Sequence, residues 1–432
     1  MWCDETKKWQ ELEQTVGGDE GKELCDALKE LYSIYTGELI DWFVGLYDIE
    51  RGGFYYSQSA VDNDEVEYNG ETYKLLPDSE STCQALGFWI NSGLADSFGK
   101  SYAKAIPEWM AEDISRYVIS LQSPNGYFYN PQWTEEMANE RISRRSRDLN
   151  WCVGMLKCFG KTPKYPTIFD KKSDNEKNTQ TMVPPNLATE ESFEEYLASK
   201  DISTKSYHVG SELVTQNSQM IALGRMDRCI EYLNSTQHQD SGHWHYEDSY
   251  YAINGIMKIS GIYNGAGKPF PNAKAAAMAA MNAITSDVSI KAVVDLWNTW
   301  IAVRNILNNL RSCGGEEGNR LADEIVGELR ARAPFAIRKT KEKILPFRKE
   351  KSSYSYGRDY PAVISQGMPV CIPHLPEGDV NATVISSASM IAVVYDALEL
   401  SKYKIPMFGE PERERYISLL EEKREKYLKE NT

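Results

Sequence analysis

Apolar residues recur every three or four positions along most of this chain, the spacing that places them on one face of a helix. In the segment 19–47 this stripe runs from Leu24 through Leu28 and Leu31 to Leu39. The same spacing predicts further helices over 79–92, 107–122, 149–159, 189–196, 207–223, 226–238, 250–262, 272–285, 290–310, 316–333, 384–400 and 411–429.

Short turns that combine glycine with aromatic residues precede several of these helices and follow one pattern. Residues 48–56, 122–129 and 239–251 each contain such a turn, and each turn leads through polar residues into an apolar helix. One helical unit cannot bury its apolar face alone, whereas stacked copies can. The repetition therefore predicts an array of helical units.

Two kinds of helix alternate along the chain. The segments 82–92, 149–159, 250–262, 292–307 and 384–400 are rich in apolar residues, and the helices between them are amphipathic and charged. A helix that is apolar all round is expected to be buried, and an amphipathic helix to face water on one side. We therefore predict an all-α fold with an inner and an outer shell of helices.

The chain is predicted to form a single domain over residues 1–432, because a closed ring of repeated units can exceed the usual size of one core. Residues 161–185 are rich in proline and lysine and lack periodicity, which predicts a loop insertion. A β-hairpin around Asn69-Gly70 is expected within 57–76. A charged helix is expected at the C-terminus, over residues 409–432.

The aromatic turns resemble those of the α/α-toroid superfamily, through Gln122 with Gly126 and Tyr127, Gln239 with Gly242 and Trp244, and Asp48 with Gly52 and Phe54. This superfamily includes prenyltransferase β-subunits, terpene cyclases, six-hairpin glycosidases and toroidal polysaccharide lyases. The resemblance implies an (α/α)6 toroid of helical hairpins with short β-like turns, and a cavity where the turns and the inner helices meet. The implied mouth of that cavity contains Asp78, Glu80, Arg147, Asp148, Glu247, Asp248, Trp297 and Asp379.

The sequence departs from two branches of this superfamily. A protein prenyltransferase needs a zinc site made by Asp, Cys and His, and no convincing set is present, so we expect no metal and no cofactor. A class I terpene synthase needs a DDxxD run, which is absent. Residues 62–65 match the acidic motif of class II cyclases, but they fall in a polar loop, so a terpene cyclase is the weakest interpretation.

The formal net charge of −15 argues against a nucleic-acid partner, because phosphates require a basic surface. No stretch reaches the roughly 18 apolar residues of a membrane span, so no membrane partner is expected. No secretory signal is visible at the N-terminus. The eight cysteines form no CxxC pair, and we interpret the chain as cytoplasmic with buried thiols.

Asp78, Glu80, Asp148 and Glu247 stand at the predicted starts of inner helices and are the candidate catalytic residues. Glycoside hydrolysis commonly uses two carboxyl groups, about 5 Å apart for retention and about 6.5 to 9.5 Å apart for inversion. Glu80 and Asp148 form the preferred pair, with Glu247 third. Acids at these positions also complement the helix dipole, so each residue has a structural alternative.

Arg144 and Arg147 are candidates for binding an acidic sugar, because guanidinium grips a carboxylate through two parallel hydrogen bonds. The alternative is a solvated basic stretch or a set of ion pairs between the shells. Aromatic rings stack on sugar faces, and polar side chains bind their edges. The further candidates for substrate binding are Trp151, His208, His243, Trp244, Tyr250 and Tyr251.

These observations predict an enzyme that hydrolyses the glycosidic bonds of an oligosaccharide by carboxylate acid/base catalysis, with an acidic oligosaccharide that contains uronic acids as the candidate substrate. One alternative is β-elimination of uronate glycans, which needs a tyrosine or histidine base and a group that neutralises the carboxylate. His208, His243 and Tyr250 are the candidate bases, and Asn150 and Arg147 the candidate neutralising groups. Another alternative is a non-catalytic toroid that binds a glycan or a protein.

Overall fold

The computed structural model describes residues 5–170 and 181–431, and it confirms the all-α class, with 64% helix and 6% strand. The helices are α1 (Glu5–Val16), α2 (Gly18–Tyr32), α3 (Glu38–Leu46), α4 (Gln58–Asp62), α5 (Ser79–Ser92), α6 (Tyr102–Ala105), α7 (Glu108–Ser120), α8 (Glu135–Glu140), α9 (Ile142–Cys158), α11 (Glu190–Ala198), α12 (Ile202–Thr215), α13 (Asn217–Ala222), α14 (Met226–Thr236), α15 (Tyr250–Ala266), α16 (Ala273–Thr285), α17 (Val293–Cys313), α18 (Gly315–Ile344), α19 (Val380–Ser386), α20 (Ala388–Ala397) and α21 (Glu410–Glu430). Short 3-10 turns are η1 (Asp96–Phe98), η2 (Pro185–Leu187), η3 (Leu345–Phe347), η4 (Glu350–Ser352) and η5 (Ser401–Tyr403).

The strands of the described residues form two-stranded antiparallel hairpins: β1 (Tyr47–Asp48) with β2 (Gly53–Phe54), β3 (Glu65–Tyr68) with β4 (Glu71–Lys74), and β5 (Ile364–Ser365) with β6 (Met368–Pro369). Tyr68 pairs with Glu71, so Asn69 and Gly70 form a two-residue turn. Both turn residues have positive φ, as the favoured hairpin turn requires. The predicted hairpin is confirmed.

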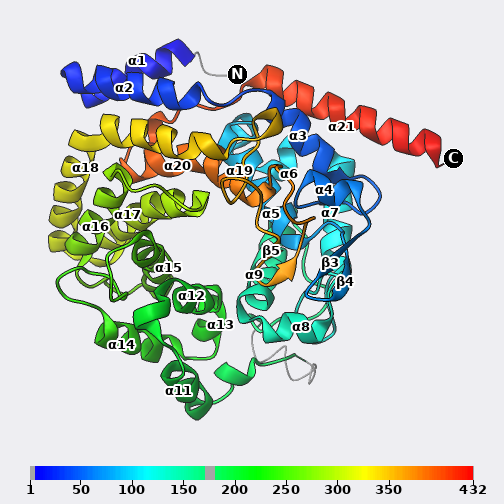
Figure 1. Cartoon of the computed structure of the whole chain (residues 1–432), viewed down its shortest axis with the longest axis horizontal. Helices are drawn as coiled ribbons and strands as arrows, with labels where there is room; N and C mark the ends of the chain where they lie inside the picture. The colour runs from blue at the N-terminus through cyan, green and yellow to red at the C-terminus, as the bar shows by residue number, and fades with distance from the viewer. Residues whose placement is uncertain (1–4, 171–180, 432) are drawn as a thin grey trace.

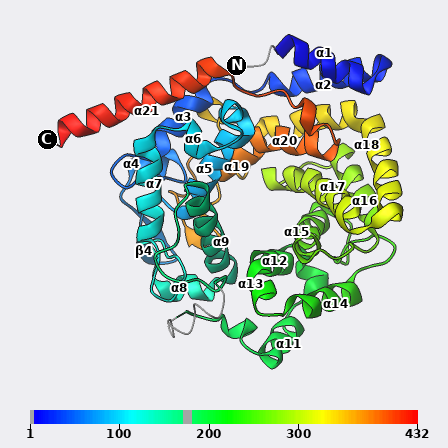
Figure 2. The same cartoon turned by 180° about the vertical axis from the view of Figure 1, so that it is seen from behind.

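Six helices of the described chain touch one another in a closed cycle, in the order α5, α9, α12, α15, α17, α19 and back to α5. Figures 1 and 2 show this cycle from opposite sides, with an opening between the ribbons at its centre. Each of these inner helices follows an outer one along the chain, namely α3, α7, α11, α14, α16 and α18. This alternation is what the toroid interpretation requires, and the assignment to that superfamily stays an interpretation.

Two large clusters of buried apolar side chains fill the wall of the ring. One joins α3, α5, α7, α9 and α21, and the other joins α2, α12, α15, α16, α17, α18 and α20. Helix α19 contributes Val380 and Val384 to the first cluster and Ala382 and Ile385 to the second. The last inner helix therefore closes the ring by packing into both halves of the core.

The predicted aromatic turns connect an outer helix to the next inner helix, and their glycines are needed there. Gly52 and Gly242 have φ angles of +81° and +71°, where a side chain is strained. A Cβ atom on Gly242 would lie 2.5 Å from the backbone nitrogen of Ala276 on α16, and one on Gly52 would lie 2.5 Å from the carbonyl oxygen of Asp113 on α7. The turns thus press directly against an outer helix.

Several predicted boundaries were wrong. The segment 19–47 divides into α2 and α3, and 207–223 divides into α12 and α13. The helix expected to end at 333 continues as α18 through Pro334 to Ile344, because Ala336, Ile337 and Ile344 prolong its buried stripe. The expected loop 161–185 contains no helix or strand in 161–170, while 171–180 lie outside the described residues.

The stretch Val380–Ala397 is long and apolar enough to cross a membrane, but 78% of it is buried in the fold. It consists of α19 and α20, which are separated by Ser387 in a non-helical conformation. The single helix predicted over 384–400 is therefore two helices of the core. The cysteines of the described residues are all free thiols.

Candidate functional site

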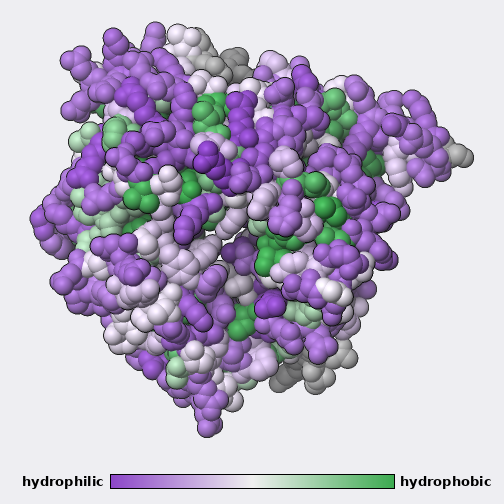
Figure 3. Space-filling view, in the orientation of Figure 1, coloured by the Kyte–Doolittle hydropathy of each residue, from purple (hydrophilic) through white to green (hydrophobic). Residues whose placement is uncertain are grey.

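A cavity of about 900 Å³ lies inside the cycle of inner helices, and each of the six contributes to its lining. We refer to it as the central cavity. Figure 3 shows the molecular surface hollowed near its centre, in the position of the opening in Figure 1. Polar and aromatic side chains dominate the lining: Tyr56, Gln84, Glu140, Arg141, Arg147, Trp151, Tyr207, His208, Glu212, Lys258, Trp297, Asn298, Tyr356, Ser365 and Asn381. Rings combined with polar groups suit a ligand with flat apolar faces and polar edges.

Beside this cavity, Arg144 binds three carboxylates in a fully buried cluster. Its Nε lies 2.9 Å from Asp148 Oδ2, its Nη1 3.1 Å from Glu80 Oε2, and its Nη2 3.1 Å from Asp78 Oδ1. None of these four side chains is more than 2% exposed. The ring of Trp133 covers the guanidinium at 4.5 Å. We refer to these four residues as the Arg144 cluster.

Neighbouring elements hold the Arg144 cluster in place through hydrogen bonds. Asp78 caps α5 by accepting from the backbone N–H groups of Glu80 and Ser81, a common arrangement at a helix start. Asp148 accepts hydrogen bonds from Ser79 Oγ at 2.7 Å and from Asn130 Nδ2 at 3.1 Å. The cluster therefore joins the starts of two adjacent inner helices, α5 and α9.

The charges of this region do not cancel. Asp78, Glu80 and Asp148 can carry three negative charges, whereas Arg144 and Arg147 carry two positive ones. A buried net charge is costly, so the ionised form of one carboxyl is disfavoured. Burial raises the pKa of Asp148 to about 6 although Arg144 opposes the shift. Asp148 can therefore hold a proton close to neutral pH.

Arg147 connects this cluster to the central cavity. Its Nη1 lies 3.2 Å from Glu80 Oε1, and 15% of its side chain is exposed. Glu80 Oε2 also accepts a hydrogen bond from Ser365 on β5 at 2.8 Å. No other described residue pairs with the guanidinium of Arg147, which lies 5.4 Å from the ring of Trp151. The rest of its N–H groups can bind a ligand in the cavity.

Lys258 of α15 provides a second basic group in the same cavity. Its Nζ lies 5.5 Å from the ring centre of Tyr207 and donates no hydrogen bond to any described residue. Burial, followed by repulsion from Arg147, lowers the pKa of Lys258 to about 7. The amine is therefore partly neutral at physiological pH, as a proton acceptor must be.

A chain of polar side chains begins at Tyr207 and Asn298 in the wall of the central cavity and ends at Asp295 beyond it. The Tyr207 hydroxyl is hydrogen-bonded to Tyr356 and Asn298. Asn298 donates to Asn254 Oδ1 at 3.0 Å, and Asn254 donates to Asp295 Oδ1 at 2.9 Å. This chain fixes the orientation of the aromatic wall. Burial raises the pKa of Tyr207, which makes that hydroxyl a poor base.

The structure brings together three of the four candidate catalytic residues. Asp78, Glu80 and Asp148 meet at Arg144, but none of them lines the central cavity. Glu247 is exposed on the third turn, away from this cluster. Asp78 caps α5, which is the structural alternative stated above for these acids, and all three acids pair with Arg144.

The candidate substrate-binding residues fall into three groups. Arg147, Trp151 and His208 line the central cavity. Tyr250 and Tyr251 line a second pocket beside it, which His208 also reaches. The others lie outside both cavities: Arg144 in its cluster, Trp244 in the apolar core with its Nε1 donating to the Leu233 carbonyl, and His243 buried in the third turn with its Nε2 2.7 Å from Asp248 Oδ1.

Two residues of this region were missed in the sequence as candidate site residues. Lys258 is the one charged residue between 252 and 262, and that interruption of an apolar helix was the available signal. Asp379, named above only near the implied mouth, caps α19 and is fully buried. Burial raises its pKa to about 7, although the backbone N–H groups of Ala382 and Tyr356 oppose the shift.

Comparison of the chain with protein-family models, curated proteins and solved structures finds no match.

Proposed function

We propose that the protein is an enzyme that cleaves the glycosidic bonds of an acidic oligosaccharide in the central cavity, by β-elimination. The observation that carries the proposal is the presence of Arg147 and Lys258, one able to bind an anion and one partly neutral, in a single aromatic-lined cavity. Elimination needs both: a cation that pairs with the uronate carboxylate, and a base that takes the adjacent proton.

In the proposed reaction, Arg147 pairs with the carboxylate and thereby makes the proton on the neighbouring carbon, C5, more acidic. The neutral amine of Lys258 takes this proton. The electron pair of the C–H bond forms a C4=C5 double bond as the bond from C4 to the glycosidic oxygen breaks. The leaving oxygen then takes a proton from the ammonium group of Lys258. His208 lines the same cavity and is the second candidate base.

Hydrolysis by Glu80 and Asp148 is the second candidate. In its favour, Asp148 has a pKa of about 6, which suits a general acid. Against it, Glu80 and Asp148 are 2% and 1% exposed and are enclosed by arginine and hydroxyl partners. A substrate in the central cavity meets Arg147, Lys258 and aromatic rings first, so elimination is favoured. A location in the cytoplasm remains part of the proposal.

The test uses oligogalacturonides and oligoglucuronates, with two readouts in parallel. Ultraviolet absorbance detects the C4=C5 double bond of an elimination product, and a reducing-end assay detects any cleavage. We expect both signals in the wild type and loss of both in Arg147→Ala. Arg116→Ala, an arginine of α7 with a 71% exposed side chain, is the matched control and retains activity.

New reducing ends without ultraviolet absorbance would show that the enzyme cleaves by hydrolysis and not by elimination. If neither signal appears with any uronate oligomer, while calorimetry detects binding, the protein is a glycan-binding toroid rather than an enzyme. Absence of both cleavage and binding would overturn the proposal.

A further inference from the structure

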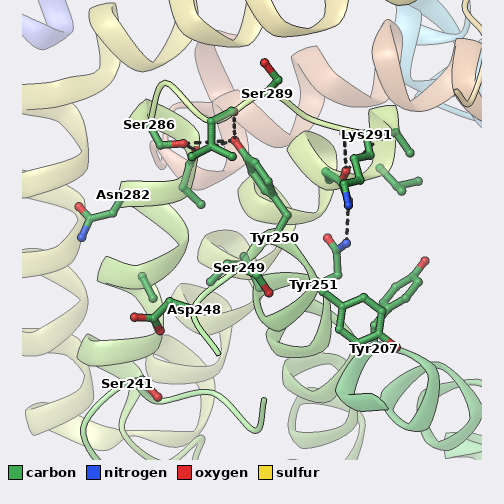
Figure 4. A pocket seen from close by; sticks show the side chains of 18 of the residues that line it. Tyr207, Ser241, Asp248, Ser249, Tyr250, Tyr251, Asn282, Ser286, Ser289 and Lys291 are labelled. Carbon is green, nitrogen blue, oxygen red and sulfur yellow. Dashed lines mark hydrogen bonds between the residues drawn. The ribbon is translucent and has the colours of Figure 1, made fainter. Parts of the chain in front are cut away.

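A second pocket, of about 1090 Å³, lies between α15, α16 and α17 beside the central cavity. We refer to it as the side pocket. Figure 4 shows Tyr250 extending across it toward the loop that carries Ser286, with Ser241 and Asp248 at one side and Tyr207 and Tyr251 at the other. The two spaces share part of one wall and are therefore neighbours.

Aromatic and small apolar side chains form the walls of the side pocket. Helix α16 contributes Met278 and Ala279, and Tyr250 of α15 lies among them. The Tyr250 hydroxyl donates to the Ala283 carbonyl oxygen at 2.9 Å, and Lys343 Nζ donates to the same hydroxyl at 2.7 Å. These bonds hold the ring in place before any ligand arrives, which suits the binding of a flat apolar group.

The charge of the side pocket is opposite to that expected for a second acidic-sugar site. Asp240, Asp248 and Asp295 line it, whereas Lys291 and His208 are its basic lining residues among those described. A carboxylate placed here meets like charges, which disfavour it. By contrast, carboxylate and serine oxygens at the rim can accept hydrogen bonds from hydroxyl groups of a neutral ligand.

The shared wall determines how the two spaces are connected. Tyr207, His208, Val294 and Tyr356 line both the central cavity and the side pocket. The two spaces therefore adjoin at these four residues, and a group that extends from a sugar in the central cavity past them would enter the side pocket. An oligosaccharide made only of uronates does not exploit a pocket with aromatic walls and acidic groups.

We propose that the side pocket binds a hydroxylated aromatic group attached to C1 of the acidic sugar, so that the substrate is a phenolic conjugate of a uronate oligosaccharide in which C4 of that sugar still carries the glycosidic bond. The binding of the acidic sugar in the central cavity rests on the proposed function. The binding of the hydroxylated aromatic group is supported by the aromatic walls, the preorganised Tyr250 ring and the acidic rim of the side pocket.

The experiment measures dissociation constants by calorimetry for methyl, hexyl and 4-hydroxyphenyl β-glucuronide, and for 4-hydroxyphenyl β-glucoside. We expect the aryl glucuronide to bind at least about tenfold more tightly than the methyl compound, and more tightly than the hexyl compound. Ala279→Trp fills the side pocket and removes this advantage while methyl glucuronide binds as before. Ala331→Trp, on the exposed surface of α18, is the matched control and leaves both affinities unchanged.

Retained binding of methyl glucuronide shows that Ala279→Trp is folded. If this variant does not fold, Ala279→Leu is the milder substitution.

Equal affinities of the methyl and aryl glucuronides in the wild type would overturn the inference. An unchanged preference for the aryl compound in Ala279→Trp would overturn it as well. Hexyl glucuronide binding as tightly as the aryl compound would overturn its aromatic part. Binding of the aryl glucoside without any preference for glucuronides would refute the acidic central site and leave the side pocket supported. Absence of binding by all four ligands would overturn both the acidic-sugar site in the central cavity and the aromatic site in the side pocket.

Discussion

Arg144 and Asp148 lie one turn apart on α9, and the ion pair between them, 2.9 Å from Nε to Oδ2, is completely enclosed by the fold. Two more carboxylates reach the same guanidinium from the start of α5. Arg144 thus neutralises carboxylates from two inner helices and links α5 to α9.

We predict that Arg144→Met lowers the free energy of unfolding at pH 7 by about 3 to 5 kcal/mol, because it leaves buried carboxylates without their cation. Urea denaturation followed by circular dichroism measures this change. The loss shrinks at pH 5, where Asp148, whose pKa burial raises to about 6, takes up a proton. Arg116→Met, on the exposed face of α7, changes stability by no more than about 0.5 kcal/mol. If Arg144→Met lowers the free energy of unfolding by no more than the Arg116→Met control does, Arg144 does not stabilise the contact between α5 and α9.

Asp379 is predicted to make stability depend on pH. Its pKa in the folded protein, about 7, is higher than the ordinary value of an aspartate, so the folded state holds the proton more tightly than the unfolded state. This contribution is fully present below about pH 4 and is lost as the pH rises through 7. Asp379→Asn keeps an oxygen for the Ala382 N–H and cannot ionise.

We therefore expect Asp379→Asn to gain stability relative to the wild type as the pH rises, by on the order of 4 kcal/mol between pH 4 and pH 8. Unfolding free energies of both proteins at several pH values supply the measurement. The difference between the two proteins isolates this residue, since other groups titrate equally in both. Parallel pH profiles would show that the folded-state pKa of Asp379 is ordinary.

The close approach of the third turn to α16 predicts a specific cost for Gly242→Ala. A Cβ atom at this position would lie 2.5 Å from the Ala276 nitrogen, in addition to the strain of positive φ. Gly224→Ala is the matched control, because Gly224 has a φ of +68° with open space around it. We expect about 1 kcal/mol of destabilisation for Gly224→Ala and at least about 2 kcal/mol for Gly242→Ala. Thermal unfolding that ranks both variants equally would exclude the contact as the cause.

The proposed role of Lys258 predicts the pH dependence of the reaction. Lysine acts as a base only when neutral, so kcat/KM on uronate oligomers should rise as the pH passes about 7. Lys258→Met should lower kcat by about 10²- to 10⁴-fold. Lys268→Met, near the exposed end of α15, should leave the profile unchanged. A rising limb that persists in Lys258→Met would assign the base to another residue, with His208 next.

Part of the site was accessible from sequence, because acids and arginines at helix starts follow a local pattern. Asp78, Glu80, Asp148 and Glu247 were predicted to meet at the mouth of the cavity. The first three meet at Arg144 without lining the cavity, and Glu247 is exposed on the third turn. What the pattern does not contain is the direction of each side chain relative to a cavity. Arg144 and Arg147, three positions apart on α9, illustrate this: one is fully buried, while the other borders the central cavity.

By itself, the sequence determined the all-α class, the alternation of apolar and amphipathic helices and the hairpin at Asn69-Gly70, because each depends on the periodicity of side chains or on the preferences of a few adjacent residues. Only the tertiary structure decided which acids are enclosed, that Lys258 faces a cavity without a hydrogen-bond acceptor among the described residues, and that a side pocket adjoins this cavity. Burial and ion pairing are set by elements distant in the chain, and these determine whether a carboxyl or an amine can meet a ligand.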